Sequence, residues 1–157
     1  MKEIVYIETT IVSYLVARPS RDLLLAAHQQ VTRDWWQEEL GHYACITSDE
    51  VLREAALGEP EMSQRRLDAL NDISMVRTDE NAIRLAQGIL EAGILPPTVF
   101  PDALHVVVAA INRASILLTW NCKHLANPHL LPRLRKYLEG QGLVLPEICT
   151  PIELAGD

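Results

Sequence analysis

The 157-residue chain is poor in the residues that mark several large protein classes. Its three cysteines, Cys45, Cys122 and Cys149, are widely spaced and form no C-x-x-C pair, which argues against a disulfide scaffold and a zinc ribbon. Long apolar runs are also missing, because the longest, such as residues 106–111, are far too short to cross a bilayer. We find no secretory signal before the first apolar segment. We therefore expect a cytoplasmic protein with reduced thiols and no membrane association.

Positive charge is scarce relative to negative charge. The chain has 14 Lys and Arg against 21 Asp and Glu, a formal net charge of −7. This balance argues against a histone-like or polybasic nucleic-acid binder. It does not exclude an enzyme that binds phosphate through a metal ion, because acidic side chains are then needed as ligands. With 48% hydrophobic and 22% charged residues, the composition is that of an ordinary globular protein, and we expect one domain over residues 1–157.

Several familiar catalytic motifs are absent from the sequence. It contains neither a G-x-G-x-x-G nor a G-x-x-x-x-G-K phosphate loop, and no G-x-S-x-G nucleophile elbow. These absences argue against dinucleotide-binding enzymes, P-loop nucleotide hydrolases and α/β-hydrolases. Any phosphate chemistry must then depend on other residues.

Short apolar runs alternate with amphipathic stretches of helical periodicity. The runs predict buried strands at residues 4–7, 43–46, 73–76, 116–119 and 143–148. Helices are predicted at residues 11–16, from residue 20 or 22 to 40, from residue 47 or 48 to 57, and at 61–70, 79–92, 98–113 and 130–138. Alternating strands and helices are typical of a parallel sheet covered on both faces. We therefore predict an α/β fold, a three-layer α/β/α sandwich with a central parallel sheet of four to five strands.

Acids, amides and hydroxyls recur where the predicted strands end, and ligands of open parallel sheets bind at that edge. These side chains are Glu8 and Thr10 after the first strand, Glu54 in the helix after the second, Asp102 at the start of the helix before the fourth, and Thr119 and Asn121 after the fourth. Converging carboxylates repel each other, and a divalent cation with oxygen ligands relieves that repulsion. The sequence thus predicts a Mg²⁺ or Mn²⁺ site able to activate water against a phosphodiester.

Four segments resemble the ordered motifs of PIN-domain ribonucleases, in particular VapC-type toxins of prokaryotic toxin–antitoxin pairs. They are residues 4–15 (IVYIETTIVSYL), residues 46–54 (ITSDEVLRE), residues 101–105 (PDALH) and residues 117–127 (LLTWNCKHLAN). Each is weak alone, but together they are in order and span most of the chain. The resemblance implies a PIN-like fold, a Mg²⁺ or Mn²⁺ cofactor and an RNA substrate. It also implies a small antitoxin as partner, and a homodimer.

The resemblance also implies roles for individual residues. The acidic metal ligands would be Glu8, Glu54 and Asp102, directly or through water, with Asn121 completing the catalytic set. Residues that would support or contact the substrate are Thr10, Thr119, Lys123 and His124, with Lys123 the strongest candidate for a phosphate contact.

Three of these positions depart from the usual family pattern. Glu8 replaces the usual Asp, while Asn121 and His124 stand where many relatives have further acids. The longer Glu8 side chain requires a displaced backbone, a weaker site or a different metal. The run from Thr119 to His124 resembles a distinct branch of the family in which Glu recurs at this position, so we interpret Glu8 as a variant ligand.

Our leading hypothesis is therefore a metal-dependent endoribonuclease that leaves 5′-phosphate and 3′-hydroxyl ends. The alternative is a PIN-fold interaction protein that has lost its chemistry through the three departures and binds a partner protein or RNA. A phosphotransfer protein or phosphohydrolase is a weaker third candidate, because it needs an Asp nucleophile where Glu8 stands.

Two ionisable residues near the motifs have plain structural interpretations. Glu50 is three residues after Thr47, which fits a helix capping box. His105 comes one helical turn after Asp102, and we expect it to pack or hydrogen-bond locally.

Overall fold

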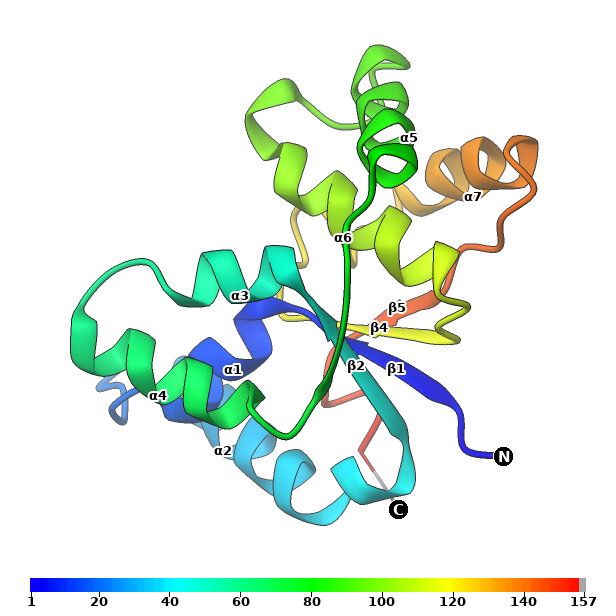
Figure 1. The fold of residues 1–157 in the computed structure, drawn as a ribbon. Helices are drawn as coiled ribbons and strands as arrows, with labels where there is room; N and C mark the ends of the chain where they lie inside the picture. The colour runs from blue at the N-terminus through cyan, green and yellow to red at the C-terminus, as the bar shows by residue number, and fades with distance from the viewer. Residues whose placement is uncertain (156–157) are drawn as a thin grey trace.

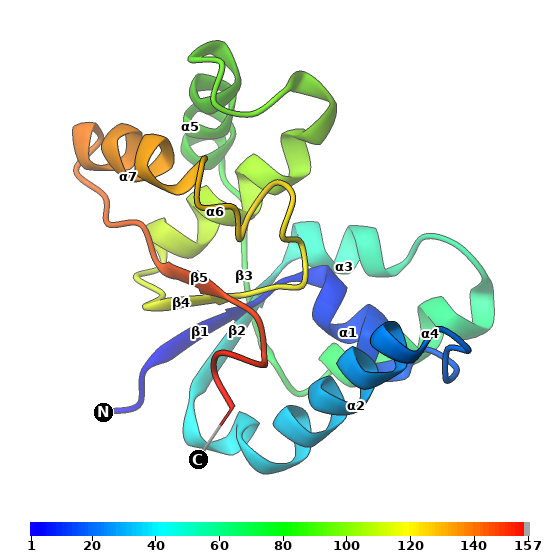
Figure 2. The same ribbon diagram turned by 180° about the vertical axis from the view of Figure 1, so that it is seen from behind.

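A central parallel sheet organises the computed structural model, which describes residues 1–155 (Figures 1 and 2). Its strands are β1 (Ile4–Ile7), β2 (Ala44–Ser48), β3 (Ser74–Val76), β4 (Ile116–Leu118) and β5 (Glu147–Cys149). Their order across the sheet is β3-β2-β1-β4-β5, and each neighbouring pair is parallel. The first strand therefore lies at the centre, with Tyr6 opposite Ile46 of β2 and Leu117 of β4.

Helices cover both faces of the sheet. They are α1 (Thr9–Val16), α2 (Leu23–Glu38), α3 (Asp49–Ala55), α4 (Pro60–Leu70), α5 (Glu80–Glu91), α6 (Phe100–Ile111) and α7 (Leu131–Gly140), with short 3-10 turns at Leu40–His42 and Pro97–Val99. Figures 1 and 2 show α5, α6 and α7 together on one side of the sheet and α2 on the opposite side. The predicted three-layer α/β/α sandwich is confirmed, with five strands.

Alternation along the central strands produces two separate cores. Tyr6 and Leu117 are buried with α5, α6 and α7 on one face of the sheet. Val5 and Ile7 are buried on the other face, with Trp35 of α2. Because successive side chains of a strand point to opposite faces, a wholly apolar strand such as β1 needs helices on both sides.

The helix α6 is buried almost all round, and residues 103–110 are all inaccessible or nearly so. A helix that is apolar on every face is stable only inside the protein. The same burial encloses one ionisable residue of this helix, His105, which has no exposed surface.

The last predicted strand and several helix ends differ from expectation. Residues 143–146 form an extended connection, and β5 comprises only Glu147–Cys149 at the edge of the sheet. The helix predicted to reach residue 113 ends at Ile111, because Arg113 adopts a left-handed conformation with φ 59°. Within residues 1–155, no helix combines the length and apolarity needed to cross a bilayer.

Candidate metal centre

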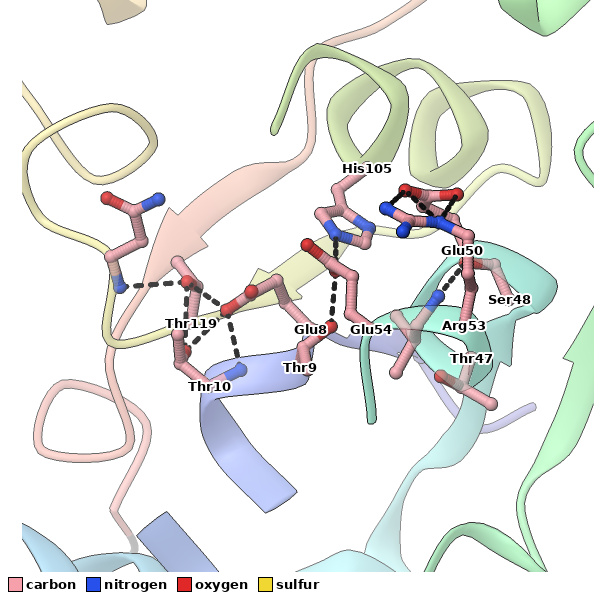
Figure 3. A network of polar contacts seen from close by, with 12 residues as sticks. Glu8, Thr9, Thr10, Thr47, Ser48, Glu50, Arg53, Glu54, His105 and Thr119 are labelled. Carbon is pink, nitrogen blue, oxygen red and sulfur yellow. Dashed lines mark hydrogen bonds and ion pairs between the residues drawn. The ribbon is translucent and has the colours of Figure 1, made fainter. Parts of the chain in front are cut away.

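Glu8 follows β1 directly and is the N-cap of α1 (Figure 3). It is only 3% exposed. Its Oε1 accepts hydrogen bonds from the Thr10 backbone N–H (3.1 Å), from the Thr10 hydroxyl and from the Thr119 hydroxyl (2.6 Å). The extra methylene of Glu relative to Asp is thus accommodated by folding the side chain back onto the first turn of α1.

Glu54 reaches the same place from the last turn of α3. Its Oε1 accepts two hydrogen bonds, from the Thr9 hydroxyl (2.6 Å) and from His105 Nε2 (2.6 Å). A carboxylate can only accept, so Nε2 of His105 carries the proton in this contact. Three elements that are distant in sequence, namely α1, α3 and α6, therefore meet at Glu54 (Figure 3).

Both acids keep one oxygen free. Every hydrogen bond found for Glu8 and Glu54 within residues 1–155 ends on Oε1, which leaves Oε2 of each without a partner. In those residues, the one fully buried side-chain nitrogen or oxygen without a hydrogen bond is Trp35 Nε1. The Oε2 atoms of Glu8 and Glu54 have no hydrogen bond either, so neither of them is fully buried. Two oriented carboxylates, each with an accessible oxygen, are the ligand type that Mg²⁺ and Mn²⁺ prefer.

A chain of buried hydrogen bonds holds His105 through Nδ1, the ring nitrogen that does not contact Glu54. Its Nδ1 lies 2.7 Å from the hydroxyl of Tyr6, and that hydroxyl lies 2.7 Å from Oγ of Ser48. Ser48 in turn caps α3, because its Oγ accepts from the Val51 N–H at 3.2 Å. The helix that carries Glu54 is thus connected to the imidazole that contacts Glu54.

Ligand atoms of Glu8, Glu54 and His105 all lie within 4.8 Å of one another. This is the one such group of acidic, histidine or cysteine side chains in residues 1–155. Because Nε2 of His105 is already bonded to Glu54, we interpret the imidazole as the residue that orients Glu54, with the two carboxylates offering oxygens to a cation.

Burial and charge move the pKa values of this group in different directions. Burial raises the pKa of Glu8, although the charge of His105 and the threonine hydrogen bonds oppose it. Burial also acts to raise the pKa of Glu54, but the hydrogen bond and charge of His105 outweigh it and hold that pKa below its usual range. Burial acts to lower the pKa of His105, but the hydrogen bond to Glu54 together with the charges of Glu8, Glu54 and Asp102 raises it. Glu54 and His105 therefore favour an ion pair, whereas the charge on Glu8 lacks a full counterpart.

Asp102 stands in the first turn of α6 and lies outside this group of three. It is half-buried, and burial raises its pKa. The charges of His105 and His124 and the side chain of Asn121 act to lower it, while the charge of Glu54 acts to raise it. Asp102 is therefore a neighbour of the centre and interacts electrostatically with His105 and Glu54.

The loop after β4 forms the other side of the centre. Thr119 has no exposed surface, donates to Glu8 and accepts from the Asn121 N–H at 2.9 Å. Asn121 Oδ1 then accepts from the His124 N–H at 3.0 Å, which closes the loop into a turn. Lys123 is exposed within that turn.

Of the acids expected as neighbours, Glu8 and Glu54 meet, but the third member of the group is His105 instead of Asp102. His105 packs inside the protein, as expected, and has no exposed surface, but its hydrogen bonds are not local, because its partners Tyr6 and Glu54 lie 99 and 51 residues away in sequence. The available signal was a single ionisable side chain inside the apolar run 103–111, since a buried imidazole needs polar partners.

The expected capping box is also wrong. Ser48, not Thr47, is the N-cap of α3, and Glu50 pairs with Arg53 at 2.5 Å. Thr47 is buried in the sheet, where its hydroxyl donates to the carbonyl of Ile7 at 3.2 Å.

Comparison with known proteins gives matches among solved structures only. No known family model matches the chain, and no curated protein matches it. A chain in the crystal structure of VapBC2 from Rickettsia felis, bound to a DNA fragment from their promoter, matches with a TM-score of 0.60 at 17% identity. The match covers 94% of this chain and 98% of that chain. VapC20 from Mycobacterium tuberculosis, a Sarcin-Ricin loop cleaving toxin, matches with a TM-score of 0.57 at 13% identity, over 76% of this chain and 92% of that one. At such identities these neighbours establish the fold, which this chain shares with them.

Proposed function

We propose that this protein is a metal-dependent endoribonuclease of the PIN type. The observation that carries the proposal is the pairing of Glu8 and Glu54, whose Oε1 atoms are fixed by hydrogen bonds while their Oε2 atoms remain free. The charge on buried Glu8 costs folding free energy unless a cation binds, which favours a functional over a structural role for this acid.

In this proposal Glu8, Glu54 and Asp102 hold a Mg²⁺ or Mn²⁺ ion, directly or through water. Bound there, the ion supplies a water of lowered pKa and positive charge for the leaving oxygen. The other groups position these acids. His105 fixes the carboxylate plane of Glu54, and the hydroxyls of Thr10 and Thr119 fix Glu8.

The loop after β4 is the proposed contact to the substrate. Lys123 is exposed beside the centre and is proposed to contact a phosphate, with Asn121 and His124 at the edge of the site. Thr10 and Thr119 were expected to contact the substrate as well. Since both hydroxyls donate to Glu8 and Thr119 is fully buried, we propose that they act on the substrate only through Glu8.

We further propose that the chain is the toxin of a toxin–antitoxin pair, a single-domain cytoplasmic protein that forms a homodimer and binds a small antitoxin. The Rickettsia felis neighbour is described as VapBC2 with promoter DNA, and the Mycobacterium tuberculosis neighbour as a toxin. A short reading frame for a DNA-binding protein next to this gene, and co-purification of its product with this chain, are the expected results.

An RNA cleavage assay tests the proposed activity. Purified protein should cut RNA in Mg²⁺ or Mn²⁺, leave 5′-phosphate ends and lose activity in EDTA. Glu54→Gln and Asp102→Asn should abolish cleavage without loss of folding. Equal cleavage in EDTA, or none with any divalent ion, contradicts the proposal.

The second candidate is a PIN-fold interaction protein without catalysis. It is favoured by Asn121 and His124, which remove two acids that many PIN nucleases carry, and by Nε2 of His105 occupying an oxygen of Glu54. A protein without a metal site should show no heat and no gain in melting temperature with Mn²⁺.

A further inference from the structure

A column of three aromatic rings stands beside the proposed metal centre. The rings of Tyr14 and Trp120 are stacked, with centroids 5.4 Å apart and planes 10° from parallel. The rings of His28 and Trp120 are stacked more closely, at 4.3 Å and 17°. The column joins α1, α2 and the loop after β4, and Figures 1 and 2 show α1 beside α2.

Hydrogen bonds fix this column to the residues that hold Glu8. The Trp120 backbone N–H donates to the hydroxyl of Thr10 at 2.8 Å, and Trp120 follows Thr119 directly. On the far side, Trp120 Nε1 donates to Thr32 Oγ1 at 2.8 Å, and that hydroxyl donates to the His28 carbonyl at 2.7 Å. The indole is therefore held at both ends, in a fixed position relative to Glu8.

Exposure is distributed unevenly along the column. Trp120 is only 8% exposed, whereas Tyr14 and His28 are partly open to solvent. Tyr14 is on α1, the helix that Glu8 caps, and burial and the charges of Cys122 and Glu8 raise the pKa of its hydroxyl. Tyr14 is thus a partly exposed ring on the helix that Glu8 caps, in a chain whose aromatic content is only 5%.

We propose that Tyr14, backed by Trp120 and His28, forms a stacking site for one unpaired nucleobase of the RNA substrate, next to the phosphate held at Glu8 and Glu54. This inference rests on the proposed function. A rigid aromatic surface beside a phosphate-binding centre matches the way proteins hold single-stranded nucleic acid, where each base presents a π-face whatever its sequence. A base inside a duplex has no free face, so the site selects single-stranded or bulged RNA.

An exposed positive charge lies on the same loop as Trp120. Lys123 is exposed three residues after Trp120, on the loop that forms the other side of the centre. A cation beside a stacking surface contacts the backbone while the ring holds the base, a combination typical of proteins that bind single strands.

A fluorescence experiment tests the proposal. The probe is single-stranded RNA of about ten nucleotides, within the usual site size for such proteins, with 2-aminopurine at one position at a time. Binding is measured in Ca²⁺ by anisotropy and by quenching of the aminopurine. For wild type and Tyr14→Phe we expect quenching at one position. For Tyr14→Leu we expect loss of that quenching and about tenfold weaker binding, the equivalent of one stacked base.

A matched control exists in the second stacked tyrosine. Tyr43 stacks on Trp35 with ring centroids 6.0 Å apart. It directly precedes β2, at the opposite end of the parallel strands from Glu8, so Tyr43→Leu should bind and quench like wild type. Tyr14→Leu should keep the Mn²⁺ affinity of wild type. If Tyr14→Leu binds and quenches like wild type with an unchanged melting temperature, the stacking site is overturned.

Abasic RNA covers the case in which Tyr14→Leu fails to fold. Removing the quenched base should weaken wild-type binding about tenfold, and an unchanged affinity overturns the proposal.

The outcomes distinguish failure of the stacking site from failure of the proposed nuclease activity. RNA cleavage with no quenched position overturns the stacking site and leaves the nuclease standing. Quenching without cleavage in any divalent ion overturns the nuclease and leaves the stacking site standing.

Discussion

His105 Nε2 and Glu54 Oε1 lie 2.6 Å apart and connect the buried helix α6 to the last turn of α3. The imidazole is fully buried, and its other nitrogen is 2.7 Å from the Tyr6 hydroxyl on the central strand. The bond therefore holds the Glu54 carboxylate in place against the buried core, while the second oxygen of that carboxylate remains accessible. We therefore expect this contact to affect both metal affinity and stability.

Removing this contact should weaken metal binding without unfolding the protein. His105→Gln is expected to raise the Kd for Mn²⁺ about 10–100-fold, the usual cost of losing a group that orients a metal ligand. Tyr6→Phe should have a smaller effect in the same direction, because it leaves His105 in place and removes one of its partners. Isothermal titration calorimetry measures both.

His42→Gln is the matched control for this prediction, since His42 pairs with Glu39 at 3.1 Å on the exposed surface. It should bind Mn²⁺ like wild type. An unchanged Mn²⁺ affinity in folded His105→Gln argues that the imidazole has a purely structural role.

The same ion pair predicts a pH window for stability in EDTA. The pKa of Glu54 is lowered from 4.5, so its contribution is complete above pH 4.5 and is lost as pH falls through the lowered value. The pKa of His105 is raised from 6.5, so its contribution is complete below pH 6.5 and is lost as pH rises through the raised value. The excess stability of wild type over His105→Gln should therefore peak between pH 4.5 and 6.5, as measured by urea unfolding. A flat difference across pH would mean that the two groups do not pair.

Glu8→Gln should separate folding from function. The pKa of Glu8 is raised above 4.5 by burial, so its ionised form opposes folding at neutral pH. Gln keeps an oxygen that accepts from Thr10 and Thr119, and it removes the charge. The metal-free variant should melt higher than wild type at pH 7, with the advantage gone below pH 4.5.

Glu8→Ala is the contrasting variant. It leaves the hydroxyls of Thr10 and Thr119 without their acceptor and should melt lower than wild type, because unpaired buried donors cost about 1–3 kcal/mol each. If Glu8→Gln also melts lower, Glu8 is a structural acid.

Far from the site, Arg113→Gly should stabilise the fold. Arg113 has φ 59° at the end of α6, a position that Gly adopts without strain, and its side chain is exposed. Relief of this strain is worth about 1 kcal/mol, or roughly 2–4 °C in melting temperature. Arg113→Ala keeps the Cβ atom and should show no gain in differential scanning calorimetry.

The sheet and its layers could be predicted from the sequence because local patterns encode them. Apolar runs such as residues 4–7 are buried on both faces, and the helices between them are marked by caps and glycines. The weakest prediction was β5, because an edge strand has only one neighbour and residues 143–148 are as apolar in an extended connection as in a strand.

The site was predictable only in part, because side-chain contacts over long sequence distances leave little local trace. Glu8 and Glu54 follow from their positions after strands, which parallel topology brings to one edge. The role of His105 depends on Tyr6 and Glu54, and neither is near it in sequence. Asp102 occupies the expected helix, but the way α6 packs places His105 instead of Asp102 against the two glutamates.

A calorimetric titration of Mn²⁺ into wild type, Glu8→Gln, Glu54→Gln and the surface control Glu61→Gln tests the central claim most directly. Glu61 is on α4, where it pairs with Arg65, and its variant should bind like wild type. If the two free carboxylate oxygens hold one cation, Glu8→Gln and Glu54→Gln should each lose at least about tenfold in affinity, or 1.4 kcal/mol. Unchanged binding in both folded variants, or no binding by wild type, would contradict the claim that Glu8 and Glu54 form a metal centre.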